Sequence, residues 1–392
     1  MPKCVLAFSG SLETLIAIPW LKEHGYDVVT LSVNLGGEPE LEELGERALI
    51  AGAAAARIED LRDTFFSDFV GPQLRALGHY ETYLLSTALA RPLIARELVR
   101  VALEEGATHV AHCSSIQGND QVRFQNAFGA LAPMLKIVSP QHEWDLRSDE
   151  QRISFARTRR LQVPTMSRTT LKYDKNLWGQ SIKCQSFDDP SYTPAEEVYT
   201  LTKPLLKAPD VPQEMQIEFK GGHPVGLDGK RTSPATLIEK LNQVAGSHGI
   251  GRADLIEDRV VGFKSREIYE APAATVLYAA KRALEQMTLS RESLQVREGL
   301  AVAYGRLVYN GQWFCDLREA LDAFFARINQ SVSGSVSVRM YKGNTTVISR
   351  SSDFSLYSTP DKSGIDHETA RGLIKVMSLP LNLEARRKKA ES

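Results

Sequence analysis

The chain has 392 residues, of which 43% are hydrophobic and 24% are charged, values typical of folded globular proteins and unlike those of disordered or fibrous chains. Its 47 basic and 48 acidic residues give a formal net charge of −1, so no global positive field would hold a nucleic acid, and we expect no such partner. No apolar run reaches the length of a membrane span and the first residues lack a signal-peptide pattern, so we expect a cytoplasmic protein that does not associate with membranes.

The four cysteines predict neither a disulfide framework nor a zinc site. Cys4, Cys113, Cys184 and Cys315 are few for the length of the chain and lack the spacing of metal ligands. We therefore expect a reducing compartment and no structural metal.

The first part of the chain predicts alternating strands and helices. We expect strands at residues 3–8, 28–33, 57–60 and 109–114. We expect helices at residues 12–24, 39–55, 86–105 and 119–130. This order is typical of a parallel sheet, so the sequence predicts an α/β domain over residues 1–165.

After residue 165 the pattern indicates an α+β domain over residues 166–365. We expect a strand at 214–220, helices at 233–246 and 275–287, and a hairpin at 334–349. The remaining segment, residues 366–392, is expected to form a C-terminal arm whose end, Arg-Arg-Lys-Lys, is basic.

Residues 9–14, Ser-Gly-Ser-Leu-Glu-Thr, lie where the first predicted strand ends and a helix begins. Free backbone N–H groups and the helix dipole favour an anion at such a point. The segment has neither the Lys of a Walker loop nor the spacing of a dinucleotide fingerprint. On these residues alone, a phosphate loop and an ordinary Ser-capped turn both remain open.

A set of longer motifs resembles the argininosuccinate synthase family over essentially the whole chain. In order they are AFSGSLETL, LSVNLGG, YLLSTALARPLIA, AHCSSIQGNDQVRFQ, YDKNLWGQSIKC, GSHGIGRADLIEDRVVGFKSREIYEAP, YKGNTTVISRSSDFSLY and IKVMSLPL. The resemblance implies a PP-loop nucleotide-binding domain, of the adenine nucleotide alpha hydrolase type, then a synthetase domain and an arm that assembles a homotetramer. It also implies a ligase in which ATP, with Mg²⁺, activates the ureido oxygen of citrulline before the amine of aspartate displaces AMP.

The resemblance assigns the binding residues position by position. Those for the nucleotide are Ala7, Phe8, Ser9, Gly10, Ser11, Leu12, Glu13, Thr14, Leu15, Val33, Cys113, Gln117 and Gly118. Those for citrulline are Tyr83, Ala88, Asn119, Arg123, Lys172, Ser181, Glu257 and Tyr269, and those for aspartate are Ser115, Asn119 and Asp120. No residue is assigned as catalytic, because such a reaction depends mainly on positioning and electrostatics.

Several of these residues also have purely structural interpretations. Arg123 could form an ion pair on a helix surface, and Glu257 could lie on a solvated strand face. Tyr83 and Tyr269 could be core aromatics, and Asp120 could be an ordinary first-turn acid.

The two nucleotide loops depart from the family's patterns, SGGLDTS and HGxTGKGND. Ser11 replaces a Gly of the first loop, and Cys113 and Ile116 replace Gly residues of the second loop. Each of these replacements adds a Cβ that can obstruct the approach of a phosphate. The first loop also has Glu13 for Asp and Leu15 for Ser. Gln117 stands for Lys, which removes a charge-assisted contact worth roughly 1.5–3 kcal/mol. We therefore expect weakened ATP binding.

Ala88 and Lys172 stand where the family has serines near the amino-acid end of citrulline. An ammonium there would repel the substrate's own ammonium, so either Lys172 turns outward, as a solvated side chain, or the substrate lacks that group. Two alternatives to the family's activity stay open. One is a paralogue that joins an amino acid to a different ureido or carbonyl substrate, and the other is a binding or regulatory protein without ATP chemistry.

Overall fold

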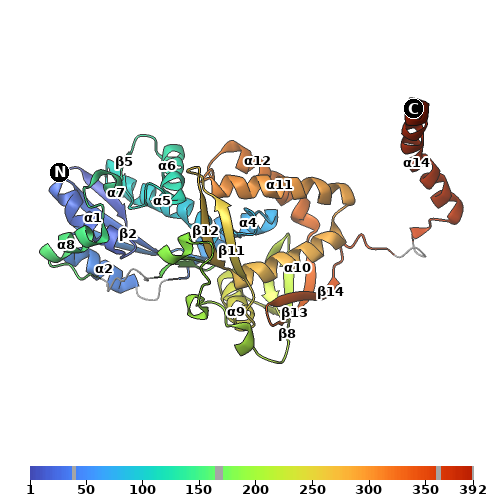
Figure 1. Ribbon diagram of the computed structural model, residues 1–392, viewed down its shortest axis with the longest axis horizontal. Coiled ribbons are helices and arrows are strands. Elements are labelled where there is room, and N and C mark those ends of the chain that lie inside the picture. The colour runs from blue at the N-terminus through green and yellow to red at the C-terminus, as the bar shows by residue number, and fades with distance from the viewer. Residues whose placement is uncertain (38–40, 164–170, 359–362, 391–392) are drawn as a thin grey trace. The chain divides into compact units, whose positions relative to one another are not determined.

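The computed structural model describes residues 1–37, 41–163, 171–358 and 363–390 of the chain (Figure 1). The chain divides into two compact units, Met1–Phe354 and Ser355–Ser392. In the described part of the first unit, the strands form three sheets. None of the helices that the structure describes is long and apolar enough to cross a membrane.

The first sheet is parallel, as the sequence predicts, and has the strand order β3-β2-β1-β4-β5. Its strands are β1 (Lys3–Ala7), β2 (Asp27–Asn34), β3 (Ala55–Asp60), β4 (His109–Ala111) and β5 (Lys136–Val138). The order reverses at β1, which lies between β2 and β4. The loops that follow β1 and β4 therefore meet at the carboxyl edge of the sheet, where open parallel sheets bind their ligands.

Helices follow the strands of this sheet in the chain. They are α1 (Leu12–Glu23), α2 (Leu41–Ile50), α5 (Ser86–Glu104), α6 (Asn119–Leu131), α7 (Pro140–Glu143) and α8 (Asp149–Thr158). The helix predicted at 39–55 is shorter in the structure: it ends at Ile50, because Gly52 has a φ of +102° and β3 already begins at Ala55. Residues 39 and 40 of that prediction lie outside the described residues.

The other two sheets are antiparallel. One has the order β10-β9-β8-β13-β14 and is built from β8 (Gln213–Lys220), β9 (His223–Leu227), β10 (Lys230–Arg231), β13 (Gly334–Tyr341) and β14 (Asn344–Ser351). The third sheet has the order β11-β12-β7-β6 and is built from β6 (Lys172–Asn176), β7 (Gly179–Lys183), β11 (Arg252–Asp258) and β12 (Lys264–Glu270). The predicted hairpin is confirmed, with Tyr341 opposite Asn344 at its turn.

Two helices of the second half, α9 (Pro234–Ser247) and α10 (Pro272–Thr288), pack against these sheets. The others are α11 (Arg291–Tyr309) and α12 (Asp316–Ile328), and the second unit contains α14 (His367–Ala390). Before α5 the chain forms α3 (Arg62–Phe65), the π-helix η1 (Phe66–Val70) and α4 (Gly71–Ala76). Short 3₁₀ turns are η2 (Gln185–Asp188), η3 (Glu196–Val198), η4 (Leu205–Lys207) and η5 (Asn329–Ser331).

Helices α11 and α12 were not among the predicted elements. Two glycines lie inside α11, and glycine lowers helix propensity. Gly305 is explained by packing, because a Cβ there would lie 2.0 Å from the backbone oxygen of His79. The glycine that weakens the local signal is thus the residue that lets α11 approach the chain before α5.

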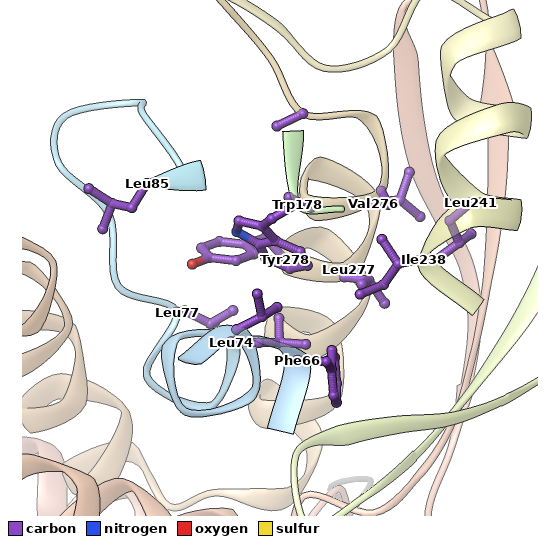
Figure 2. Close-up of a cluster of buried hydrophobic side chains, with 14 of the residues drawn as sticks. Phe66, Leu74, Leu77, Leu85, Trp178, Ile238, Leu241, Val276, Leu277 and Tyr278 are labelled. Atoms are coloured by element: carbon purple, nitrogen blue, oxygen red, sulfur yellow. The ribbon is translucent and has the colours of Figure 1, made fainter. Parts of the chain in front are cut away.

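A buried apolar cluster around Trp178, just before β7, joins the segment that includes α4 and leads to α5 with α9 and α10 of the second half (Figure 2). Trp178 is fully buried, and its Nε1 donates to the Leu84 oxygen at 2.9 Å. The side chain of Asn176 donates to the Ser86 oxygen at 2.8 Å, which ties β6 to the first residue of α5. These contacts set the third sheet against the amino end of α5, where the candidate site lies.

Candidate active site

A polar cleft opens where the amino ends of α5 and α6 meet the third sheet. Its lining residues are Tyr83, Thr87, Asn119, Asp120, Arg123, Ser181, Lys183, Glu257, Arg259, Glu267 and Tyr269. Of the positions that the resemblance assigns to the two amino acids, all but Ala88, Ser115 and Lys172 line this cleft.

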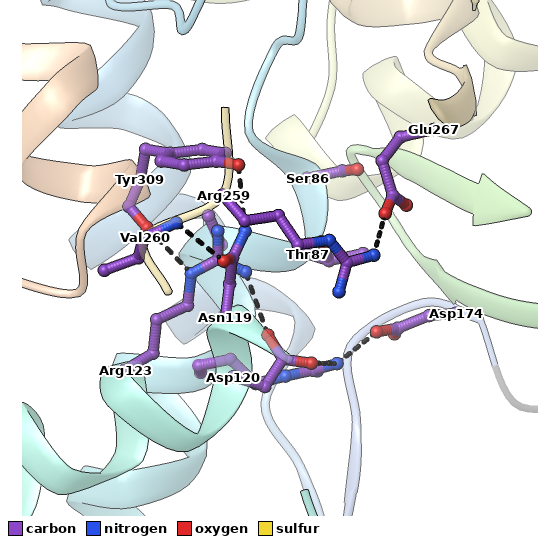
Figure 3. A network of polar contacts seen from close by, with 12 residues as sticks. Ser86, Thr87, Asn119, Asp120, Arg123, Asp174, Arg259, Val260, Glu267 and Tyr309 are labelled. Carbon is purple, nitrogen blue, oxygen red and sulfur yellow. Dashed lines mark hydrogen bonds and ion pairs between the residues drawn. The ribbon is translucent and has the colours of Figure 1, made fainter. Parts of the chain in front are cut away.

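Asp120, in the first turn of α6, lies between two arginines (Figure 3). It accepts hydrogen bonds from Arg91 Nη2 and Arg123 Nη1, each at 2.9 Å. Burial disfavours ionisation of the carboxyl, but Arg91 and Arg123 outweigh it and hold the pKa of Asp120 well below its usual range. Asp120 therefore stays an anion and can bind an ammonium.

Arg123 is only 4% exposed, which excludes the interpretation as a surface ion pair. Its Nε donates to the Tyr309 oxygen at 3.0 Å, and its guanidinium lies 5.2 Å from the centre of the Tyr309 ring. A guanidinium carries five N–H donors. Among the described residues only Tyr309 and Asp120 accept from it, so donors remain for a substrate carboxylate.

Glu257, on β11, is 1% exposed, which excludes a solvated strand face. Its two oxygens accept hydrogen bonds from the hydroxyls of Tyr269, at 2.9 Å, and Tyr309, at 2.6 Å. Burial raises the pKa of Glu257 above its ordinary value, while the Tyr309 hydroxyl and then the Tyr269 hydroxyl act in the opposite direction. The carboxyl is thus held in one orientation.

Tyr309, the last residue of α11, is a central residue of the site that the sequence did not indicate. Its hydroxyl accepts from Asn119 Nδ2 at 2.9 Å, and its ring stacks on Tyr80 at 3.7 Å between centres. The Asn119 oxygen accepts from the Val260 N–H at 3.0 Å (Figure 3). Asn119 therefore fixes the start of α6 against α11 and the turn after β11.

Tyr83 combines a structural role with a place in the cleft. Its hydroxyl accepts from the N–H groups of Thr87 at 2.9 Å and Ala88 at 3.3 Å, in the first turn of α5. The residue before α5, Leu85, supplies no side-chain cap, so the phenol satisfies these helix N–H groups. The ring stacks on Tyr269 with 3.9 Å between centres.

Arg259 and Glu267 are further residues of the cleft that the sequence did not indicate as site residues. They form an ion pair, and Arg259 Nε also donates to Ser265 Oγ at 2.6 Å. Arg259 Nη1 donates to the Gln117 oxygen at 3.2 Å. Both residues lie within one of the quoted motifs, yet only the hairpin of β11 and β12 turns them toward the loop that follows β4.

The first nucleotide loop joins β1 to α1 at the switch point of the parallel sheet. Ser11 is the N-cap of α1, and its side chain accepts from the Thr14 N–H at 3.4 Å. Ser11 has a φ of −64°, so this position does not require glycine, whereas Gly10 has a φ of +73°. Arg47 Nη2 donates to the Gly10 oxygen at 2.8 Å and holds the loop in place.

The second nucleotide loop follows β4. Neither Cys113 nor Ile116 has a positive φ, so the path of this loop does not require glycine at either position. His112 Nδ1 accepts from the Ser114 N–H at 3.3 Å, and His142 Nε2 bonds the Ser114 oxygen at 3.0 Å. Burial, assisted by His142, lowers the pKa of His112 to about 4, so this imidazole is neutral near pH 7.

The remaining assigned residues lie around these loops. Val33, on β2, is part of the strand that neighbours β1, and Gly118 is the N-cap residue of α6. Ala88 is fully buried, and the exposed Ser115 accepts from the Gln117 N–H at 3.3 Å. In the described part of the chain, no group of three His, Cys, Asp or Glu side chains could hold a metal ion.

Lys172 lies at the start of β6 and does not line the cleft. Its Nζ donates to Glu13 Oε1, in the first turn of α1, at 3.2 Å. Of the two possibilities that the sequence left open, the structure has this side chain turned away from the amino-acid cleft and toward the first nucleotide loop.

Comparison with known proteins gives the same family for both halves of the chain. Residues 3–162 match the family described as "Arginosuccinate synthase N-terminal HUP domain", and residues 172–384 match "Arginosuccinate synthase C-terminal domain". Two relatives named argininosuccinate synthase, from Pelotomaculum thermopropionicum and Carboxydothermus hydrogenoformans, are 47% and 44% identical, over 98% of this chain and 98% and 97% of theirs. A third, named argininosuccinate synthase, chloroplastic, from Arabidopsis thaliana, is 43% identical over 99% of this chain and 80% of its own length.

Proposed function

The chain belongs to the argininosuccinate synthase family, and we propose that its polar cleft binds the two amino-acid substrates of that family's reaction. The protein is a ligase of arginine biosynthesis that uses ATP to join citrulline and aspartate. Relatives 43–47% identical over nearly the whole chain do not favour a different substrate or a protein without ATP chemistry.

The assignment of the cleft rests on three charged groups that lie together there: the ionised carboxylate of Asp120, the guanidinium of Arg123 and the buried carboxyl of Glu257. Arg123 supplies N–H donors for the carboxylate of citrulline. Asp120, kept ionised by its two arginines, binds the α-ammonium of aspartate. Glu257, oriented by two phenols, accepts N–H groups of citrulline. The chain's contribution is mainly to position the amine of aspartate near the activated carbon.

The nucleotide site is proposed at the carboxyl edge of the parallel sheet, between the loops after β1 and β4. The N-terminus of α1, opened by Ser11, supplies N–H groups and the positive end of a helix dipole. Mg²⁺ would enter with the nucleotide, as this ion commonly does in phosphate-transferring enzymes, and would neutralise part of the charge on the phosphates.

Steady-state assays test the function directly. Purified protein given citrulline, aspartate, ATP and Mg²⁺ should release AMP and pyrophosphate, and release should require both amino acids. Arg123→Ala should abolish the reaction and the citrulline-induced rise in Tm, whereas Arg157→Ala, on an exposed residue of α8, should change neither. A wild type that releases no AMP, or an Arg123→Ala protein with a full citrulline response, would contradict the assignment.

We also propose that the protein is a cytoplasmic homotetramer with the predicted division into residues 1–165, 166–365 and 366–392. Support comes from α14, whose apolar side chains are exposed within its own unit: Leu373, Ile374, Val376, Met377, Leu379, Leu381 and Leu383. A helix with this many exposed apolar residues needs a partner surface. Light scattering on the full chain and on a chain stopped after Asp366 should show a tetramer that the truncation disrupts, and a monomeric full chain would refute the proposal.

A further inference from the structure

Two lysines lie side by side on β6 and β7, and one of them, Lys183, lines the cleft. In the antiparallel pairing of β6 with β7, Lys172 is directly opposite Lys183, and Asp174 is opposite Ser181. Directly opposite residues project from the same face, with Cβ atoms about 4.5–5.5 Å apart. Ser181 and Lys183 line the cleft, so this face of the sheet is turned toward the site.

The charges of this lysine pair are only partly balanced. Like charges directly opposite each other destabilise a sheet. Lys172 pairs with Glu13 at 3.2 Å, whereas Lys183 has no ion-pair or hydrogen-bond partner within the described ranges. Burial acts to raise the pKa of Glu13, but Lys172, a backbone N–H and then Arg152 outweigh it, so this carboxyl is an anion. Lys183 helps to lower the pKa of Asp120, but that carboxylate is already hydrogen-bonded to Arg91 and Arg123. An anionic ligand would supply the missing counter-charge.

The position of the pair relates it to both substrate sites. At one end, Lys172 reaches Glu13, in the first turn of the helix that opens the nucleotide loop. Two residues further along β6, Asp174 pairs with Arg91, which also binds Asp120 of the cleft. β6 therefore runs from the nucleotide loop to the amino-acid cleft, with Lys172 at the end that contacts the loop and Lys183 beside it on β7, at the cleft.

The proposed reaction releases an anion, pyrophosphate, on the side of the cleft that faces the nucleotide loop. The ureido oxygen of citrulline forms a bond to the α-phosphorus of ATP while the bond from that phosphorus to the bridging oxygen breaks. The electron pair of the broken bond leaves on pyrophosphate. Because citrulline lies in the cleft, in-line displacement directs pyrophosphate away from it, toward the nucleotide loop.

We propose that Lys172 and Lys183 together bind the β- and γ-phosphates of ATP and the departing pyrophosphate, and thereby supply the cation that Gln117 does not. Each ammonium has three N–H donors, of which Lys172 uses one on Glu13. This inference rests on the proposed function only in taking ATP as the substrate of the nucleotide loop.

Calorimetric titration of the full-length protein with ATP and with inorganic pyrophosphate tests the pair. Lys172→Gln and Lys183→Gln should each weaken both affinities by about 10-fold or more, the loss expected for one charge-assisted contact. Each should also flatten the dependence of both affinities on salt concentration. Lys175→Gln is the matched control, because this exposed lysine lies on the same strand but alternates to its other face.

The outcomes separate this inference from the proposed function. A wild type that turns over citrulline with ATP, together with lysine variants of unchanged affinity for ATP and pyrophosphate, overturns the inference alone. Variants that lose citrulline affinity instead would also overturn it, since the lysines would then contact the amino acid. A wild type that binds neither ATP nor pyrophosphate overturns the proposed function along with it.

Discussion

Replacing Tyr309 by Phe removes one hydroxyl from the centre of the site and leaves the ring in place. The hydroxyl donates to Glu257 at 2.6 Å and accepts from Asn119 at 2.9 Å. A hydrogen bond to a charged group contributes about 1.5–3 kcal/mol and a neutral one about 1 kcal/mol, so we expect the free energy of unfolding to fall by about 2.5–4 kcal/mol at pH 8.

The pH dependence of this loss follows from Glu257. Its pKa in the folded state is raised, so its contribution to stability is fully present below its unfolded pKa, about 4.3, and is lost as pH rises through the folded value. The Tyr309 hydroxyl opposes this rise by stabilising the ionised form. Tyr309→Phe should therefore raise the pKa of Glu257 further and destabilise the protein more at pH 8 than at pH 4.5.

Urea unfolding followed by circular dichroism at both pH values measures the effect. Tyr80→Phe is the matched control, because its ring stacks on Tyr309 but its hydroxyl donates to a backbone oxygen, that of Asp258, at 3.0 Å. Tyr80→Phe should lower the free energy of unfolding by about 0.5–1.5 kcal/mol at either pH. Equal losses for the two variants, or a loss for Tyr309→Phe that does not grow with pH, would refute the assigned network.

Three further variants test the packing and the loops. Glu285 pairs with the buried Lys281 and Arg297, so Glu285→Ala should lower the free energy of unfolding in urea by about 3–5 kcal/mol. Glu298 is an exposed partner of Arg297, so Glu298→Ala should lower it by at most about 1 kcal/mol. Gly305→Ala should lower Tm, since its Cβ would meet a backbone oxygen at 2.0 Å, and Gly299→Ala, with open space around it on the same helix, should raise it. Gln117→Lys should tighten ATP binding in calorimetry by about 10-fold or more.

Each of these expectations has a clear contrary result. Equal costs for the two glutamate variants would mean that the buried charges find other partners. Equal shifts in Tm for the two glycine variants would mean that α11 moves to accommodate the methyl group. An unchanged ATP affinity in Gln117→Lys would mean that residue 117 does not face the phosphates.

The sequence by itself determined the parallel sheet, the loop that opens α1 and the motifs that identify the family. Strand and helix periods are local properties, so β1, α1, α5 and α6 follow from runs of a few residues. The assigned residues Asp120, Arg123 and Glu257 also meet in one cleft. The sequence did not determine how their charges are balanced, because that depends on neighbours far along the chain.

Only the tertiary structure decided the partners of these residues. Tyr309 contacts Arg123 across 186 positions of sequence, and no local pattern marks it as a site residue. The direction of Lys172 depends on the placement of β6 beside the first turn of α1, 159 residues away at Glu13. The physical reason is that side chains acquire their electrostatic roles from the packing of separate sheets and helices, whereas sequence periodicity specifies only which face of its own element each side chain occupies.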